Sequence, residues 1–345
     1  MASHPKIVAV GGGKGGVGKS TVSILLAFWF ARMGKKTILV DADLGGANLH
    51  TFMGIKNPPR TLNDFVTKRY DSLEEISLNT EMENLYLIAG ASDILSLANI
   101  HVSQKAKLIQ SLARLDADYV VLDLGAGTSY NVLDFFLVAE KKVVVMTPQP
   151  ISIQNAYAFI RNTVYRRLSQ LVSQKSSLQT IIKTAMDTNN ELKVRTVSEL
   201  LQIIQELDGR EAMTALQEEI RNIQPFIITN MTRTSRDKGA GRVIQIVADK
   251  YLMIHSVDLG NIVYDHKLYA MVTDMFPLTN LIQSSDAFAS VYGMAMTLLR
   301  DKQSICPLKT EESLLNHFRG EKLRGQDHQP ASFAFTRLNP NSEPP

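Results

Sequence analysis

The chain has 345 residues, of which 45% are hydrophobic and 21% charged, and its formal net charge is +3. This balance excludes a disordered chain, and the charge is too small by itself to indicate a nucleic-acid-binding protein. The single cysteine, Cys306, excludes a disulfide within one chain and a metal site made only of cysteines. The longest strongly apolar run, residues 24–31, is about half of what a membrane-spanning helix needs, and residues 1–30 lack the pattern of a signal peptide. We therefore expect a cytoplasmic protein.

Short apolar runs alternate with longer helical patterns over the first 150 residues. Runs that predict strands buried on both faces lie at residues 6–10, 37–40, 85–88, 119–122 and 142–146. Helical patterns between them lie at residues 20–33, 103–115 and 132–139. This alternation predicts an α/β fold with three layers, in which a mostly parallel, twisted sheet carries helices on both faces.

The pattern changes beyond residue 150. Helical patterns without a clear strand follow at residues 152–167, 168–186, 196–207 and 210–222. Strand and helix signals then resume at residues 226–229, 239–251, 257–263 and 286–299. We expect one sheet-based domain over residues 1–300, with a helical insertion at about 168–224.

Residues 301–345 are expected to form a C-terminal extension, with a short helix followed by a disordered tail. Four of the 12 prolines lie between Pro330 and Pro345, which disfavours regular structure there. Residues 311–324 form an amphipathic stretch that Gly320 interrupts. This stretch leaves a membrane surface open as a partner.

The most specific motif is G-x-x-x-x-G-K-[ST], which is formed by Gly13, Lys14, Gly15, Gly16, Val17, Gly18, Lys19 and Ser20. Glycines allow backbone N–H groups to approach phosphate oxygens, and the helix that follows directs its positive end at them. Lys19 is expected to neutralise the β- and γ-phosphates, and the Ser20 hydroxyl to bind Mg²⁺. With Thr21, the next helical residue, these residues predict an ATP-binding site.

Three aspartates follow predicted strands at the edge of the sheet where ligands bind in open α/β folds. Asp41 and Asp43 come directly after the second strand, and Asp123 ends the strand before the glycine-containing segment DLGAGTS. A carboxylate at such a position suits Mg²⁺, partly through water. We therefore predict that Ser20, Asp41 and Asp123 hold the metal. Each aspartate alone also fits a turn or a helix cap.

Asn230 ends the strand at residues 226–229. Its amide both donates and accepts hydrogen bonds, which suits the edge of a purine base. We predict that it contacts adenine, and a plain turn residue is the alternative.

Lys14 gives the phosphate loop the form KGGxGK[ST], and here the chain resembles the MinD/ParA family of deviant-Walker-A ATPases. The resemblance implies an ATP-dependent homodimer in which Lys14 reaches the ATP of the other subunit. It also implies that Lys14, Lys19 and Asp43 act in hydrolysis, with Asp43 positioning the attacking water, and that Asn230 reads the base.

Four further strings resemble the FlhG/FleN branch of this family, which controls flagellar number and placement: VDADLGGANLH, LIAGAS, DLGAGTS and TPQPISIQNAYAFI. The resemblance covers about residues 6–160 and 225–300. It implies a molecular switch that hydrolyses ATP slowly and positions or regulates a cellular machine through a protein partner. By analogy with MinD, the ATP-bound form is expected at the inner face of the membrane.

Several alternatives remain open at this point. The basic run of Arg233, Arg236, Lys238 and Arg242 fits either a solvated loop or a ParA-like DNA contact. A P-loop enzyme acting on a small molecule and a nucleotide sensor without hydrolysis also fit the motif. A carrier of an iron–sulfur cluster needs at least two cysteines per chain, and no metal other than Mg²⁺ is predicted.

Two smaller predictions concern helices. The aromatic run at residues 28–30 is expected to pack in the core. Arg166 and Arg167, near the start of the insertion, are expected to be surface charges.

Overall fold

The computed structural model describes residues 4–43, 46–90, 100, 102–187, 191–274 and 285–300. An eight-stranded sheet runs through it in the order β3-β4-β2-β5-β1-β6-β7-β8. The strands are β1 (Lys6–Gly11), β2 (Thr37–Ala42), β3 (Leu78–Asn79), β4 (Leu85–Ile88), β5 (Tyr119–Leu124), β6 (Lys141–Met146), β7 (Pro225–Thr232) and β8 (Val257–Val263). All neighbours pair in parallel except β3 and β4. The predicted mostly parallel sheet is therefore confirmed.

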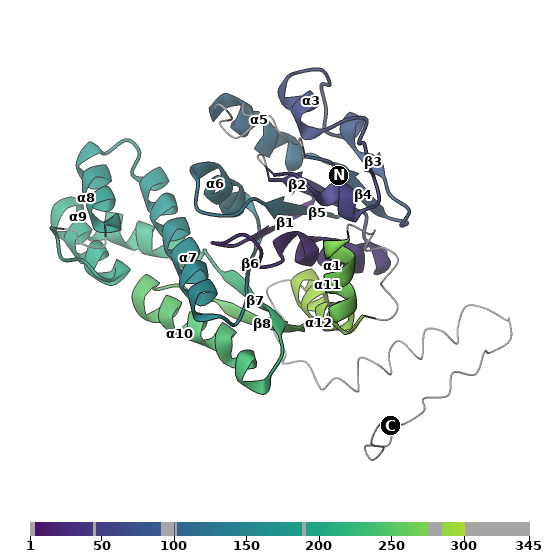
Figure 1. Cartoon of the computed structure of the whole chain (residues 1–345). Coiled ribbons are helices and arrows are strands. Elements are labelled where there is room, and N and C mark those ends of the chain that lie inside the picture. Colours follow the sequence, from purple (N-terminus) through teal and green to yellow (C-terminus); the bar gives the residue numbers. More distant parts are fainter. Residues whose placement is uncertain are drawn as a thin grey trace, which may run out of the picture. The chain divides into compact units, whose positions relative to one another are not determined.

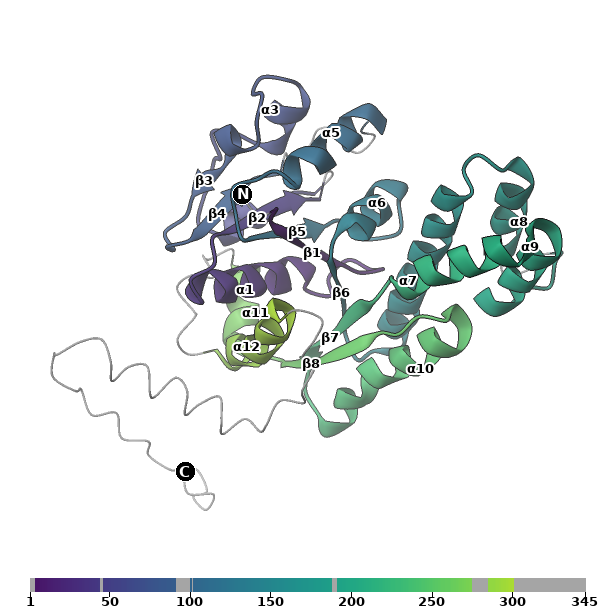
Figure 2. The same ribbon diagram turned by 180° about the vertical axis from the view of Figure 1, so that it is seen from behind.

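Helices cover both faces of the sheet (Figures 1 and 2). They are α1 (Lys19–Arg32), α2 (Leu49–Phe52), α3 (Leu62–Val66), α5 (Val102–Leu112), α6 (Tyr130–Val138), α7 (Pro150–Leu171), α8 (Ser176–Met186), α9 (Val197–Arg221), α10 (Ala240–Leu252), α11 (His266–Thr273) and α12 (Asp286–Leu299), with short 3₁₀ turns η1 (Glu74–Ile76) and η2 (Ser235–Gly239). On one face α1 packs between the sheet and α12. On the other face one apolar cluster joins the sheet to α5, α6, α7 and α10.

Helix α1 is apolar around most of its circumference because it is covered on two sides. Phe28, Trp29 and Phe30 are all buried, so the prediction that they pack in the core is confirmed. The Trp29 ring stacks on Phe288 of α12 with 4.4 Å between ring centroids, and its indole N–H donates to the Phe288 carbonyl at 3.0 Å. A helix with this pattern needs a second covering layer, which α12 supplies.

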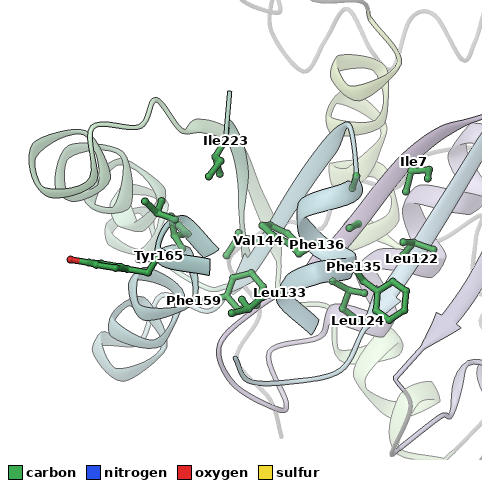
Figure 3. Packing of buried hydrophobic residues seen from close by; sticks show 14 of the residues in the cluster. Ile7, Leu122, Leu124, Leu133, Phe135, Phe136, Val144, Phe159, Tyr165 and Ile223 are labelled. Atoms are coloured by element: carbon green, nitrogen blue, oxygen red, sulfur yellow. The ribbon is translucent and has the colours of Figure 1, made fainter. Parts of the chain in front are cut away.

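Aromatic and branched side chains pack on the opposite face of the sheet (Figure 3). Phe136 of α6 and Phe159 of α7 meet edge to face with 4.9 Å between ring centroids, and both lie close to Val144 of β6 (Figure 3). Both rings lie next to Gly11 of β1, so this contact holds the middle of α7 against the strand that precedes the phosphate loop.

Three helices, α7, α8 and α9, connect β6 to β7, where the sequence predicts four helical segments. The predicted boundary between residues 167 and 168 is wrong, because α7 continues to Leu171. Its buried residues Val164, Tyr165 and Leu168 form a continuous stripe that carries the helix across that point. The predicted break near residue 209 is confirmed, since Gly209 adopts φ 88° and kinks α9.

Several short elements were not predicted: α2, α3, β3, η1, η2 and α11. These elements are too short for the spacing of their hydrophobic residues to reveal a helical or strand period. One carried a readable signal, since Thr61 and Asp64 form a capping box at the start of α3.

Some sequence predictions lie outside the described residues: the extension at 301–345 with its stretch 311–324, and Cys306. Within the part of the chain that the structure describes, no helix is both long and apolar enough to cross a membrane.

A charged cluster is built into the helical layer around Asp134, the acidic residue of the mostly apolar helix α6. Arg166 of α7 donates to both carboxylate oxygens, from Nε at 2.7 Å and from Nη2 at 2.9 Å. Lys105 of α5 and Gln170 of α7 also donate to this carboxylate. The side chain of Asp134 is only 7% exposed and that of Arg166 only 23%. The prediction that Arg166 is a surface charge is therefore wrong.

Arg167 is also paired, with Glu219 of α9 at 2.6 Å, although this pair is about one-third exposed. It was predicted as a plain surface charge and instead ties α7 to α9. Both arginines face partners on neighbouring helices, which the spacing along α7 alone does not reveal.

The Asp134 cluster stabilises the packing of α5, α6 and α7. Burial by itself raises the pKa of the Asp134 carboxyl, but hydrogen bonds from Arg166 and Lys105 outweigh burial and hold the pKa below its usual range. A depressed pKa in the folded state means that the charged carboxylate stabilises the fold above the ordinary aspartate pKa. That contribution is lost as the pH falls through the lowered value.

We predict that Asp134→Asn lowers the free energy of unfolding by about 3 kcal/mol at neutral pH, because it leaves two cations without their shared carboxylate. Urea denaturation of both proteins measures the difference. The gap between parent and variant should shrink below about pH 4, where the parent carboxylate is protonated in the unfolded state.

The matched control is Asp116→Asn, which breaks an ion pair with Lys36 in which Asp116 is 86% exposed. It should leave stability nearly unchanged. Equal effects of the two substitutions would show that the buried cluster does not stabilise the helical layer.

Candidate nucleotide-binding site

The carboxyl ends of the central parallel strands bring the predicted site residues to one edge of the sheet. The phosphate loop follows β1, and Asp41 of β2 is the register partner of Asp123 of β5. Asn230 lies near the end of β7, on the other side of β1. Residues that are far apart in the sequence therefore surround the turn between β1 and α1.

The first part of the loop is pressed against β6 and α7. A Cβ atom at Gly12 would lie 2.7 Å from the Val145 carbonyl oxygen, and one at Gly13 only 2.1 Å from the Asn155 carbonyl oxygen. Both separations are too short for non-bonded atoms. Only glycine fits at these two positions, so no side chain covers the backbone of Gly12 and Gly13.

The end of the loop is held by Asn230. Gly18 adopts φ +89°, and a Cβ there would lie 2.2 Å from the Asn230 amide nitrogen. That nitrogen donates to the Val17 carbonyl at 2.9 Å, while the Asn230 side-chain oxygen accepts from the Met231 N–H. Met231 has a positive φ of 59°, beside an irregularity in the pairing of β7 and β8. In this structure Asn230 supports the loop, and its contact with adenine stays a prediction.

Lys19, Ser20 and Asp123 lie together beneath the loop. Lys19 is 8% exposed and Asp123 is 2% exposed. The Ser20 hydroxyl bonds to Asp123, and the Ser23 hydroxyl donates to the same carboxylate at 2.9 Å. The first turn of α1 is thus joined to the end of β5.

Asp41 and Asp43 lie at the end of β2 and differ in exposure. Asp41 is fully buried and accepts hydrogen bonds from the backbone N–H groups of Asp43 and Leu49. Asp43 is half-buried, and a Cβ added at Gly125 would lie 2.9 Å from its carboxylate oxygen. The glycine after β5 therefore lets the segment at residues 125–129, here named the switch loop, approach Asp43 closely.

Burial shifts the pKa values of the charged groups at this edge of the sheet. It raises the pKa of Asp41 to about 8, with Asp123 adding to the shift, and it raises the pKa of Asp123 to about 6. Burial also lowers the pKa of Lys19, although Asp123 and Asp43 oppose the change. Added positive charge would stabilise the ionised carboxylates.

Most of the remaining motif residues are accessible, whereas Val17 is buried. Lys14, Gly15 and Gly16 are exposed, and Thr21 is partly exposed on α1. The two lysines of the motif thus lie in different environments, since Lys19 is buried under the loop and Lys14 projects at the surface.

The basic run after β7 lies on the surface. Arg233, Arg236, Lys238 and Arg242 are all exposed. The Arg233 guanidinium lies over the Tyr264 ring, 4.0 Å from its centroid, and its backbone N–H donates to Asp237. Neither the solvated-loop interpretation nor the DNA interpretation of this run is excluded by these contacts.

Sequence reasoning missed three contributors to the site. Ser23 bonds to Asp123, Asn155 of α7 touches the loop at Gly13, and a Cβ at Gly90 would lie 3.0 Å from the Asp41 carboxyl carbon. Ser23 had a usable signal, because a serine one turn after Ser20 faces the same side of α1. The other two depend on packing between distant segments.

The residues present fit a magnesium–nucleotide complex. The loop forms a cradle without side chains, a buried lysine lies below it, and a hydroxyl is hydrogen-bonded to a carboxylate where a hard cation would bind. Within the described ranges no group of three or more histidine, cysteine or acidic side chains gathers as a metal site.

Comparison with known proteins supports this interpretation. The family model for ParA, described as "NUBPL iron-transfer P-loop NTPase", matches residues 3–171. Antiactivator FleN of Pseudomonas aeruginosa is 36% identical over 161 residues, which are 46% of this chain and 56% of FleN. The match therefore spans just over half of FleN. An uncharacterized ATP-binding protein of Methanocaldococcus jannaschii, MJ0547, is 30% identical over 198 residues, which are 57% of this chain and 70% of that protein.

Solved structures share the fold. The septum site-determining protein MinD of Pyrococcus horikoshii, complexed with Mg-ADP, superimposes with a TM-score of 0.57 at 20% identity. The superposition covers 86% of this chain and 96% of MinD. The superposition shows the fold, and the family-model and sequence matches show that the chain belongs to the MinD/ParA family of P-loop NTPases.

Proposed function

We propose that the chain is an ATP-dependent dimerising switch that hydrolyses ATP slowly and thereby positions or regulates a cellular machine. The observation that carries the proposal is the pair of loop lysines in contrasting environments. Lys19 is buried beside Asp123 in its own subunit, whereas Lys14 is exposed at the rim of the same loop. An exposed lysine there is available to a nucleotide held by a second copy of the chain.

Each site residue has a proposed part. The backbone of residues 13–18 and the Lys19 ammonium bind the phosphates, and Lys14 adds charge from the partner subunit, so that catalysis rests on positioning and electrostatics. Asp43, half-buried against the switch loop, orients the attacking water. Asn230 holds the loop and lies at the same sheet edge, where its second amide hydrogen can face adenine.

Mg²⁺ is the proposed metal cofactor. Ser20 and Asp123 would hold it, with Asp41 acting through water, and when bound it would neutralise charge on the phosphate oxygens. The raised pKa of Asp41 and that of Asp123 support this assignment, because a divalent cation would favour both carboxylates in their ionised form.

The relatives suggest the class of process. One is named an antiactivator and another a septum site-determining protein. We infer that this chain acts through a protein partner, at the inner membrane face in its ATP form. A ParA-like contact with DNA is the second candidate, favoured by the exposed cations of η2 and α10.

Iron transfer is not proposed, although the family model carries that description. A cluster held between two copies needs four cysteine ligands, and the chain has one cysteine.

We predict that Lys14→Ala separates dimerisation from nucleotide binding. The variant should bind a fluorescent ATP analogue within a few-fold of the parent, yet remain a monomer with ATP, because the lost charge contacts only the other subunit's nucleotide. Lys19→Ala should weaken binding about tenfold or more, since it removes a charge-assisted hydrogen bond. Light scattering with ADP and with ATP measures the mass. The switch is contradicted if the mass of the parent is the same with ADP and with ATP. It is also contradicted if the mass of Lys14→Ala doubles when ATP is added.

Asp43→Asn is predicted to lower the rate of ATP hydrolysis about 10²-fold while leaving the ATP-bound dimer intact, because the amide does not orient water as the carboxylate does. Phosphate release and light scattering measure the two properties. The control is Asp249→Asn, an exposed aspartate of α10, which should match the parent. Turnover by Asp43→Asn at the parent rate would remove Asp43 from its proposed role.

A further inference from the structure

A polar cleft lies beside the switch loop, whose residue Thr128 lines it. It has a volume of about 510 Å³ and is bounded by the start of α6, by α7 and by α8. In both views α8 and α9 lie together beside α7 (Figures 1 and 2). We name it the α6–α8 cleft. Its lining residues are Thr128, Tyr130, Leu133, Asn162, Arg166, Ser169, Gln170, Ser173, Gln179, Lys183 and Met186.

The chemistry of the lining favours an anionic ligand. Two of these residues, Arg166 and Lys183, are cationic, most of the others are hydroxyl or amide side chains, and none of the described lining residues carries a carboxylate. Arg166 shares the single carboxylate of Asp134 with Lys105, so the cluster behind the cleft keeps one positive charge in excess. Lys183, exposed on α8, adds a second. A carboxylate can accept hydrogen bonds from these cationic, hydroxyl and amide groups, and the excess positive charge attracts it.

The cleft is connected to the phosphate loop by a very short path. The Gly127 N–H donates to the Gly12 carbonyl at 3.3 Å, and Gly127 has φ +92°, which favours glycine. The next residue, Thr128, already lines the cleft. Tyr130 begins α6, and its ring lies under the Arg166 guanidinium, 4.3 Å from the centroid. A shift of the switch loop would therefore move one wall of the cleft.

We propose that the α6–α8 cleft is the docking site for an acidic segment of a partner protein, and that its affinity depends on the nucleotide at the phosphate loop. Only the nucleotide dependence rests on the proposed function. A volume of this size holds a few side chains of an extended peptide. The helical insertion then has a role, because α8 supplies the wall that carries Lys183.

The test uses the full chain and a fluorescein-labelled peptide of alternating glutamate and serine, with fluorescence anisotropy as the readout at near-physiological salt. Binding should be saturable, and it should vanish when glutamine replaces glutamate in the peptide. Lys183→Glu should weaken it at least tenfold, which is about 1.4 kcal/mol. The matched control, Lys250→Glu on the exposed side of α10, makes the same charge change outside the cleft and should bind within about twofold of the parent.

The outcomes are separable. No saturable binding, equal losses in the two lysine variants, or Lys183-dependent binding of citrate without binding of the peptide would each overturn the docking site. Peptide affinity should change at least about threefold between ADP and a non-hydrolysable ATP analogue, and Tyr130→Ala should abolish that change.

Nucleotide binding is measured in parallel with a fluorescent ATP analogue. If the nucleotide binds and the peptide affinity is the same in both states, the coupling is overturned. If the nucleotide does not bind, the proposed function fails, whereas the peptide result still decides the docking site.

Discussion

The close approach of the phosphate loop to its neighbours is the constraint on which the rest of the site depends. Gly12, Gly13 and Gly18 pass so near to β6, α7 and Asn230 that no Cβ fits. Three separate elements therefore hold the turn in place. The Phe136–Phe159 contact and the irregularity in β7 belong to this support, since each fixes one wall of the turn.

Charge at the sheet edge follows from that geometry. The parallel register places Asp41 directly beside Asp123, and the loop places Lys19 over Asp123. Burial in such a site disfavours every charged form, so the pKa values of both aspartates rise and that of Lys19 falls. A bound cation would stabilise the ionised form of both aspartates, and a bound anion would stabilise the ionised form of Lys19. A magnesium–nucleotide complex supplies both charges.

In the helical layer that covers the sheet, the Asp134 carboxylate holds neighbouring helices together. Asp134 gathers donors from α5 and α7, and Arg166 in turn covers Tyr130 at the end of the switch loop. The helices that follow β6 are therefore joined to the segment that approaches both Asp43 and the phosphate loop. We expect the loss of this shared carboxylate to cost more than the loss of a surface ion pair, because Lys105 and Arg166 are largely covered by protein.

Local patterns were sufficient to predict the seven main strands, the mostly parallel sheet, the phosphate loop and the aspartates at the ends of β2 and β5. Apolar runs and glycine motifs act over a few residues, so these features are visible without tertiary contacts. The tertiary structure alone decided that Arg166 is largely covered and paired with Asp134, that α7 continues past residue 168, that Asn230 supports the loop, and that Thr128 lines a cleft with Lys183. Each of these depends on segments far apart in the chain, and the distance between such segments is set by packing, which no short stretch of sequence contains.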